Sequence, residues 1–210
     1  MKAILFSDDP RFIQTVWGPS QQARLRQIAD LHPEIVPPSR LVEYASVAAQ
    51  TEVIFTTWGM PRLTPEQLGL LPRLKAVFYA AGSVKGFADT LLDRDIKVFS
   101  AWAANAVPVA EFALSQILFS LKQGWRHVMA LKCNPSPEAW VRQPLTGAYQ
   151  ATVGIISLGM IGRKLCEYLR PFDLKKKIYD PFVSEETVRQ LGGERVTLPE
   201  IFATSDVVTL

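Results

Sequence analysis

The sequence predicts an α/β protein built on parallel β-sheets that carry helices on both faces. Short apolar runs recur along the 210 residues, and segments with helical spacing lie between them. This alternation is typical of parallel sheets, because each strand must return through a crossover that is usually a helix. The clearest unit lies at residues 151–180, where an apolar run, a turn with two glycines, a helix and a second apolar run follow one another.

Composition and charge exclude several classes of protein. Hydrophobic residues make up 48% of the chain and charged residues 20%, so a core can form. The net charge of +3 is spread without a basic stripe, and nucleic acid is therefore not an expected partner. No uncharged apolar run approaches about 18 residues, so no membrane span is predicted. Cys133 and Cys166 lie far apart without histidine clusters, which favours a reduced, cytoplasmic protein that holds no metal.

Residues 1–100 are predicted to alternate between strands and helices. The expected strands are Ala3–Phe6, Val53–Phe55, Ala76–Tyr79 and Ile96–Phe99. We expect Ser20 to cap a helix. The apolar positions of that helix are Leu25, Ile28 and Ala29. Another helix is expected to begin at Thr64-Pro65-Glu66, because proline suits the first helical turn.

Two loops in this part of the chain are candidate ligand-binding loops. Trp58-Gly59 follows one predicted strand, and Ala81-Gly82 follows the next. Ligands of parallel sheets bind beyond the carboxyl ends of the strands, where both loops are expected to lie.

A long apolar helix is predicted from residue 105 to about residue 129. Its apolar face consists of Ala110, Ala113, Leu114, Ile117, Leu118 and Leu121. At 1.5 Å per residue the helix would be roughly 35 Å long, enough to bridge two domains, although a core helix fits the pattern equally well. Residues 133–150 contain three prolines and a glycine and are expected to form a loop or linker.

Residues 151–180 have the order of a dinucleotide-binding unit. Val153 to Ile156 form a buried strand, Gly159 and Gly162 lie in the turn, and Pro171 ends the helix that follows. Such a turn lets backbone N–H groups meet a pyrophosphate at a helix N-terminus. Asp180 closes the second strand eighteen positions after Gly162 (180 − 162). This is the place of the acidic residue that binds the ribose hydroxyls.

Ser157 departs from the usual G-x-G-x-x-G pattern of these sites. It occupies the position of the first glycine, which serves the tight turn, whereas Gly159 and Gly162 keep the second and third positions. The serine either strains the turn or offers its hydroxyl to a phosphate. We favour strain, because glycine is used there for its backbone freedom. The loop is thus expected to be a weakened dinucleotide site.

The rest of the chain extends this unit. Ser184 is expected to cap a helix that has Glu185 and Glu186 in its first turn and ends at Gly192-Gly193. Another helix is expected to start at Pro199, and a strand at residues 206–210.

Several short segments together resemble the D-isomer-specific 2-hydroxyacid dehydrogenases, which include glyoxylate/hydroxypyruvate reductases and phosphoglycerate dehydrogenases. The segments are Ala81-Gly82, Asn105–Glu111, Gly154–Gly162, Tyr179–Pro181 and Ser205–Leu210. The resemblance covers the whole chain and rests on their order and spacing. It implies a flavodoxin-like substrate domain at residues 1–100, followed by the first half of a Rossmann NAD-binding domain at residues 101–210.

The resemblance also implies roles for individual residues. The backbone amides of Ala81 and Gly82 would hold a substrate carboxylate. The cofactor-binding residues would be Ser157, Gly159, Met160, Ile161, Gly162 and Asp180. Because the Asp180 carboxylate repels a 2′-phosphate, NAD is favoured over NADP. The implied reaction interconverts a D-2-hydroxy acid and a 2-oxo acid by hydride transfer, in a cytoplasmic homodimer.

Catalysis in this family requires an arginine and a histidine–glutamate pair, which the resemblance places beyond Leu210. His32, in an expected loop, and His127, at the end of the long helix, are expected to be structural. Arg163 is expected to lie near phosphate, and Phe112 stands where some members have a small or hydroxyl-bearing residue near the nicotinamide. The leading hypothesis is therefore a truncated dehydrogenase whose 210 residues alone are inactive, bind NAD weakly and self-associate.

Two other hypotheses stay open at this point. One is a non-catalytic NAD-binding module that senses the cofactor or assembles with partners. The other is a doubly wound domain with a degenerate phosphate loop and no ligand. The coding sequence beyond residue 210 would separate the dehydrogenase from the non-catalytic module. A thermal shift with NAD would separate these two NAD-binding proteins from the domain without a ligand. Which 2-hydroxy acid is used cannot be read from these residues.

Overall fold

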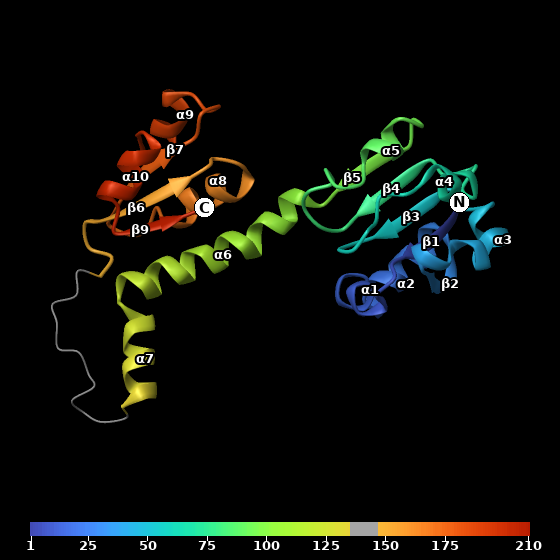
Figure 1. Cartoon of the computed structure of the whole chain (residues 1–210), viewed down its shortest axis with the longest axis horizontal. Helices are drawn as coiled ribbons and strands as arrows, with labels where there is room; N and C mark the ends of the chain where they lie inside the picture. Colours follow the sequence, from blue (N-terminus) through green and yellow to red (C-terminus); the bar gives the residue numbers. More distant parts are fainter. Residues whose placement is uncertain (135–146) are drawn as a thin grey trace. The chain divides into compact units, whose positions relative to one another are not determined.

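The computed structural model describes residues 1–134 and 147–210 (Figure 1). It divides into two compact units, Met1–Asn105 and Ala106–Leu210, and each unit has a parallel sheet of its own. The prediction of a mixed α/β protein with parallel sheets is confirmed. Most of the predicted linker at residues 133–150 lies outside the described residues.

The first unit is built on five parallel strands. They are β1 (Lys2–Phe6), β2 (Asp30–Val36), β3 (Val53–Thr56), β4 (Ala76–Tyr79) and β5 (Lys97–Ser100). Their spatial order is β2-β1-β3-β4-β5. This is the flavodoxin-like order, in which the chain changes direction between β1 and β3. The carboxyl ends of the strands, and hence the loops after β3 and β4, share one edge of the sheet.

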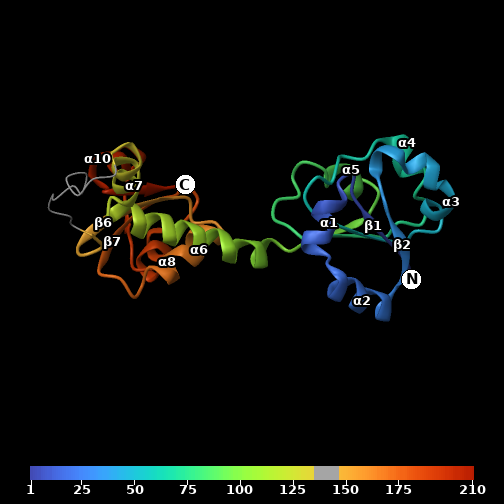
Figure 2. The ribbon, with the colours of Figure 1, turned by 90° about the horizontal axis from the view of Figure 1, so that it is seen from below.

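Apolar clusters cover both faces of this sheet. Alternate residues of β1 enter different clusters: Ile4 and Phe6 belong to one, and Ala3 and Leu5 to the other. A strand buried on both faces must be apolar throughout, as β1 is. The helical segments are α1 (Pro10–Val16), α2 (Pro19–Ile28), the 3-10 helix η1 (Pro38–Tyr44), α3 (Ala45–Ala48), α4 (Pro65–Gly69) and α5 (Asp89–Leu92). Figure 2 shows α2 and α4 on opposite sides of the sheet.

Strand β2 corrects the expectation of a loop around His32. Proline cannot donate a hydrogen bond to a neighbouring strand, so the segment that contains Pro33 does not look like a strand in the sequence. The structure places β2 at the edge of the sheet, where it pairs only with β1. The register between the two strands shifts between Ala3 and Leu5, opposite Pro33, and this irregularity accommodates the missing donor.

The helix boundaries are confirmed in part. Helix α4 begins at Pro65, as the Thr64-Pro65-Glu66 segment predicted, and Thr64 and Gln67 form a reciprocal capping box there that was not predicted. The prediction that Ser20 caps α2 is wrong: Gly18 is the cap residue, and proline takes the first helical position. Ile28 is 69% exposed and does not share the buried face. Helix α1 was not predicted.

The second unit is built on four parallel strands. They are β6 (Ala151–Ile156), β7 (Leu174–Tyr179), β8 (Glu194–Arg195) and β9 (Val207–Thr209), in the spatial order β8-β7-β6-β9. Numbered within the unit, this order is 3-2-1-4, which matches the beginning of the Rossmann order. The helices are α7 (Gly124–Cys133), α8 (Met160–Tyr168), α9 (Glu185–Gln190) and α10 (Leu198–Thr204).

Helix α6 (Trp102–Leu121) begins in the first unit and continues into the second. The expectation that it runs to residue 129 is wrong, because Gln123 has a left-handed φ of 52° and separates α6 from α7. Ala110, Ile117 and Leu121 are buried in the core of the second unit. By length and composition α6 could also cross a membrane, but a core helix meets the same criteria.

Candidate functional site

The phosphate loop, Ser157 to Gly162, joins β6 to α8. Strand β6 has β7 on one side and β9 on the other, so the loop leaves the sheet where the strand order reverses. Nucleotides bind at this point in doubly wound sheets. Gly159 is the cap residue of α8, and no side chain caps the helix. The helix therefore presents its positive end to whatever lies in front of the loop.

The two glycines of the loop serve different purposes. A Cβ on Gly162 would lie 2.2 Å from the carbonyl oxygen of Ser157, which no side chain could tolerate. Gly162 thus allows α8 to pack against the end of β6. A Cβ on Gly159 would meet nothing closer than the Ser157 hydroxyl at 3.9 Å, and Gly159 is exposed. Gly159 leaves the backbone open to a ligand.

Ser157 adopts a backbone conformation that favours glycine. Its φ is 80°, which costs a residue with a Cβ about 1–2 kcal/mol. Its amide donates to the carbonyl of Tyr179 at 2.8 Å, which ties the loop to the end of β7. Within the described residues its hydroxyl has no hydrogen-bond partner. These observations agree with the strained turn favoured from the sequence.

Backbone donors gather at the start of α8. Among residues 1–134 and 147–210, no acceptor receives the amide N–H groups of Gly159, Met160, Ile161 and Gly162. The first amides of any helix lack partners within the helix. Here they lie at an exposed loop without a capping side chain, which is the arrangement that binds anions such as phosphate.

Asp180 lies directly after β7 and is 8% exposed. Its Oδ2 accepts from the Leu158 amide at 2.7 Å, and its Oδ1 accepts from the Phe182 amide at 2.8 Å. These backbone hydrogen bonds, with that of Leu158 the strongest, hold the pKa of Asp180 below its ordinary value, and the nearby Arg163 adds to the effect. The ionised carboxylate still has lone pairs for further donors, such as ribose hydroxyls.

Sequence reasoning did not find that Asp180 also holds the phosphate loop. The spacing after Gly162 predicted only a ribose contact. Arg163 completes the arrangement, because its Nε donates to the Leu158 carbonyl at 2.9 Å. The backbone N–H and the carbonyl group of Leu158 are therefore both held by charged side chains. Phe182, which is 94% exposed beside Asp180, is a further candidate contact that was missed.

In the first unit, the loop after β4 has the features expected of a carboxylate-binding backbone. Within the described residues, the amides of Ala81 and Gly82 donate to no acceptor. Their carbonyl groups accept from the hydroxyl of Ser100, which fixes the loop. The side-chain nitrogen of Asn105 would lie 3.2 Å from a Cβ on Gly82, so the Asn105 amide lies against this loop.

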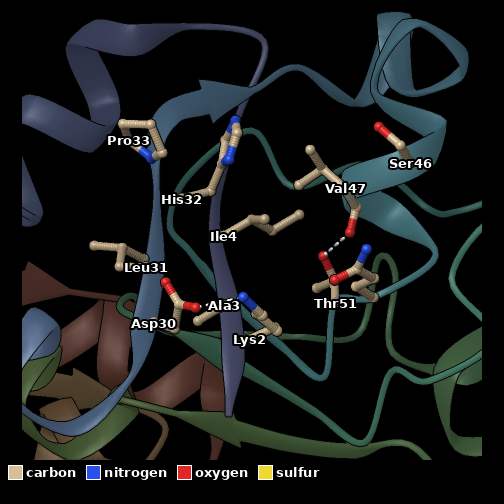
Figure 3. A pocket seen from close by; sticks show the side chains of 11 residues that line it. Lys2, Ala3, Ile4, Asp30, Leu31, His32, Pro33, Ser46, Val47 and Thr51 are labelled. Carbon is tan, nitrogen blue, oxygen red and sulfur yellow. Dashed lines mark hydrogen bonds and ion pairs between the residues drawn. The ribbon is translucent and has the colours of Figure 1, made fainter.

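The two histidines lie in neither loop. His32 lies in β2 and His127 in α7. Figure 3 shows His32 at the wall of a hollow of about 260 Å³, together with the ion pair of Lys2 and Asp30. Lys2 and Asp30 are the first residues of β1 and β2, so this hollow lies toward the amino ends of the strands. Among the described residues, no group of three His, Cys, Asp or Glu side chains could hold a metal.

Residues 119–210 match the family model described as the D-isomer specific 2-hydroxyacid dehydrogenase, NAD binding domain. The D-3-phosphoglycerate dehydrogenase of Bacillus subtilis is 25% identical over 152 residues, which cover 71% of this chain and 28% of the relative. The enzyme of the same name from Mycobacterium bovis is 28% identical over 148 residues, or 69% of this chain and 27% of the relative.

Solved structures share the fold. A phosphoglycerate oxidoreductase from Rhizobium etli superposes with a TM-score of 0.73 at 20% identity, over 98% of this chain and 64% of the other. A D-lactate dehydrogenase from Aquifex aeolicus, complexed with NAD and lactic acid, gives a TM-score of 0.65 at 22% identity, over 98% of this chain and 59% of the other.

This chain spans less than a third of the length of the two curated relatives and less than two thirds of these two structures. Within that span the family model covers the α8 loop, β7 and Asp180, which form the dinucleotide unit described above. Residues 119–210 therefore match the NAD-binding domain of the D-isomer specific 2-hydroxyacid dehydrogenases, and NAD is the cofactor of that domain.

Proposed function

We propose that this chain acts in the NAD-dependent interconversion of a D-2-hydroxy acid and a 2-oxo acid. The first unit would hold the substrate, and the second would hold NAD. The observation that carries the proposal is the phosphate loop, where four backbone amides at the start of α8 have no acceptor among the described residues and the Asp180 carboxylate closes the adjacent strand. NAD, when bound, supplies the hydride acceptor or donor.

The geometry of the loop supports NAD binding by these residues. The exposed backbone at Gly159 would admit the pyrophosphate, and the amides of Met160, Ile161 and Gly162 would donate to it. Asp180 would accept from the ribose hydroxyls of the adenosine half. Its negative charge, maintained by a lowered pKa, would repel a 2′-phosphate and so favour NAD over NADP.

The loop after β4 supports the substrate class. The amides of Ala81 and Gly82, which donate to no acceptor in residues 1–134 and 147–210, could hold a carboxylate, which every 2-hydroxy or 2-oxo acid has. The fixed carbonyl groups of the same residues keep the loop in one conformation through Ser100. Asn105, which lies against Gly82, would add a polar group beside the carboxylate.

We further propose that the protein is a cytoplasmic homodimer and that α6 contributes to the interface. Phe112 is 66% exposed on α6, and Val109 and Phe119 are also exposed. Apolar residues clustered on one exposed element commonly mark an interface.

A non-catalytic NAD-binding module is the second candidate. The phosphate loop alone would serve it, because exposed backbone amides at the start of α8 and the Asp180 carboxylate are sufficient to bind NAD. This module would bind NAD through the same amides and Asp180 but would not reduce a 2-oxo acid.

Assays of the whole chain test the proposal and separate the two candidates. NAD and NADH binding are measured first by calorimetry. NADH oxidation is then followed with glyoxylate and hydroxypyruvate, and NAD reduction with D-lactate and D-3-phosphoglycerate. Saturable NAD binding supports both candidates. Turnover by the protein produced from the complete coding sequence supports the dehydrogenase, and NAD binding without turnover by that protein supports the module. Absence of binding to either form of the cofactor would refute both. Gly82→Ala, which crowds the substrate loop, should raise KM for the acid and leave NAD affinity unchanged.

A further inference from the structure

Leu158 is held through the two peptide units that flank it, each by a charged side chain. Its amide donates to Asp180 Oδ2 at 2.7 Å, and its carbonyl accepts from Arg163 Nε at 2.9 Å. The Leu158 side chain is itself buried, at 2% exposure. Hydrogen bonds that involve an ionised group are stronger than neutral ones, so the two contacts fix the orientation of the peptides before and after Leu158.

The neighbouring residue is the one that needs such support. Ser157 has a φ of 80°, which glycine adopts freely and serine does not. If Leu158 were released at either of these two peptides, the Ser157–Leu158 peptide could rotate and Ser157 could return to an ordinary backbone conformation. The carbonyl of Ser157, which passes close to Gly162, would then move, and so would the start of α8.

From this geometry we propose that Arg163 is a positioning residue of the cofactor site: by holding the Leu158 carbonyl opposite Asp180, it keeps the phosphate loop in its binding conformation despite Ser157. The proposal rests on the proposed function, since it assumes that NAD binds at this loop. Arg163 need not contact the cofactor. Arg163 acts by raising the fraction of molecules in which the phosphate loop has its binding conformation. The apparent affinity for NAD is proportional to that fraction.

The proposal predicts that Arg163 and Ser157 are coupled. With Ser157 present, Arg163→Met should let the loop relax and raise the Kd for NAD roughly tenfold, the effect of losing one hydrogen bond from a charged donor. In a Ser157→Gly background the same change should raise Kd less than about threefold, because glycine holds the positive φ without help. Ser157→Gly alone should tighten binding slightly.

Lys164→Met provides a matched control. Lys164 is the next residue on α8, carries the same charge and pairs with Glu167 rather than with the loop. If Arg163 acted only as a positive charge near the phosphates, the two methionine variants would weaken binding equally. The proposal predicts that Lys164→Met changes Kd less than twofold.

Calorimetry of NAD with wild type, the single variants and the double variant Ser157→Gly/Arg163→Met completes a double-mutant cycle. Equal effects of Arg163→Met in both backgrounds, or an equal effect of Lys164→Met, would overturn the positioning role. Circular dichroism confirms that each variant is folded.

Amide exchange of Leu158, followed by NMR without NAD, tests the loop independently of the cofactor. Arg163→Met should accelerate this exchange about tenfold with Ser157 and much less with glycine. If wild type binds no NAD, the proposed function fails, and this exchange still decides whether Arg163 holds the loop. An unchanged Leu158 exchange rate in Arg163→Met would refute it.

Discussion

Gly162→Ala tests most sharply how the phosphate loop is built. The added Cβ would lie 2.2 Å from the Ser157 carbonyl oxygen and 3.7 Å from Ile155 Cγ2. The second distance is an ordinary contact, whereas the first is shorter than a Cβ allows. The Ser157 carbonyl or the first turn of α8 must therefore move by roughly 1 Å to restore van der Waals contact.

The expected cost follows from what resists that movement. Overpacking of a close-packed site costs about 1–3 kcal/mol, and alanine recovers up to about 1 kcal/mol of helix propensity relative to glycine. Movement of the loop would also weaken the hydrogen bonds of Leu158 with Asp180 and Arg163, each worth about 1 kcal/mol or more. The sum is a loss of about 2–3 kcal/mol, which for a unit of this size lowers Tm by roughly 10 °C.

Thermal unfolding and NAD calorimetry of the same variant provide the measurement, and Gly159→Ala is the matched control. An alanine at 159 meets only the Ser157 hydroxyl at 3.9 Å, so Tm should stay within about 2 °C of wild type. NAD affinity should nevertheless fall in both variants, because the pyrophosphate needs the bare backbone at Gly159. If Gly162→Ala melted at the wild-type temperature, the close contact of α8 with β6 would be wrong.

Three further outcomes are expected. Asp180→Ala should narrow the preference for NADH over NADPH by about 1–3 kcal/mol, measured by titration with both cofactors, and a wild-type preference for NADPH would contradict this role. The pKa of Asp180 is lower in the folded protein than the ordinary value of about 3.9, so its contribution to stability is complete above about pH 4 and is lost as pH falls through the folded pKa. The stability difference between wild type and Asp180→Asn, followed by denaturant unfolding, should therefore shrink below pH 4, and a constant difference would argue against the ionised pairing. Phe112→Ser on α6 should reduce the dimer fraction in analytical ultracentrifugation, and a monomeric wild type would refute the proposed interface.

Strand periodicity and glycine placement were sufficient to predict most of the fold. The apolar runs at β1 and β3 are buried on both sides, and that at β4 is buried on one side and partly buried on the other, so their sequences carry the signal directly. Strand β2 was missed because proline removes a donor, and only the neighbours of a strand reveal that it lies at an edge. The end of α6 was missed because Gln123 adopts a left-handed backbone conformation, which cannot be predicted from a glutamine in the sequence.

For the candidate site, the sequence indicated which residues are candidates for cofactor binding but not how they support each other. Gly159, Gly162 and Asp180 follow from a fixed spacing, because each serves a backbone or charge requirement of the ligand. The hydrogen bonds that join Asp180 and Arg163 to Leu158 depend on the exact path of the turn. Such contacts produce no periodic pattern in the sequence, so they become visible only in the three-dimensional structure.

An NMR titration of the isotope-labelled chain with NADH tests the central claim most directly. The amides of Gly159, Met160, Ile161 and Gly162 should shift progressively and saturate together, and Leu158 should respond through its bond to Asp180. NADPH should produce the same shifts only at higher concentration. Shifts confined to other parts of the chain, such as the hollow beside His32, or no shifts at all, would contradict the assignment of this loop as the NAD site.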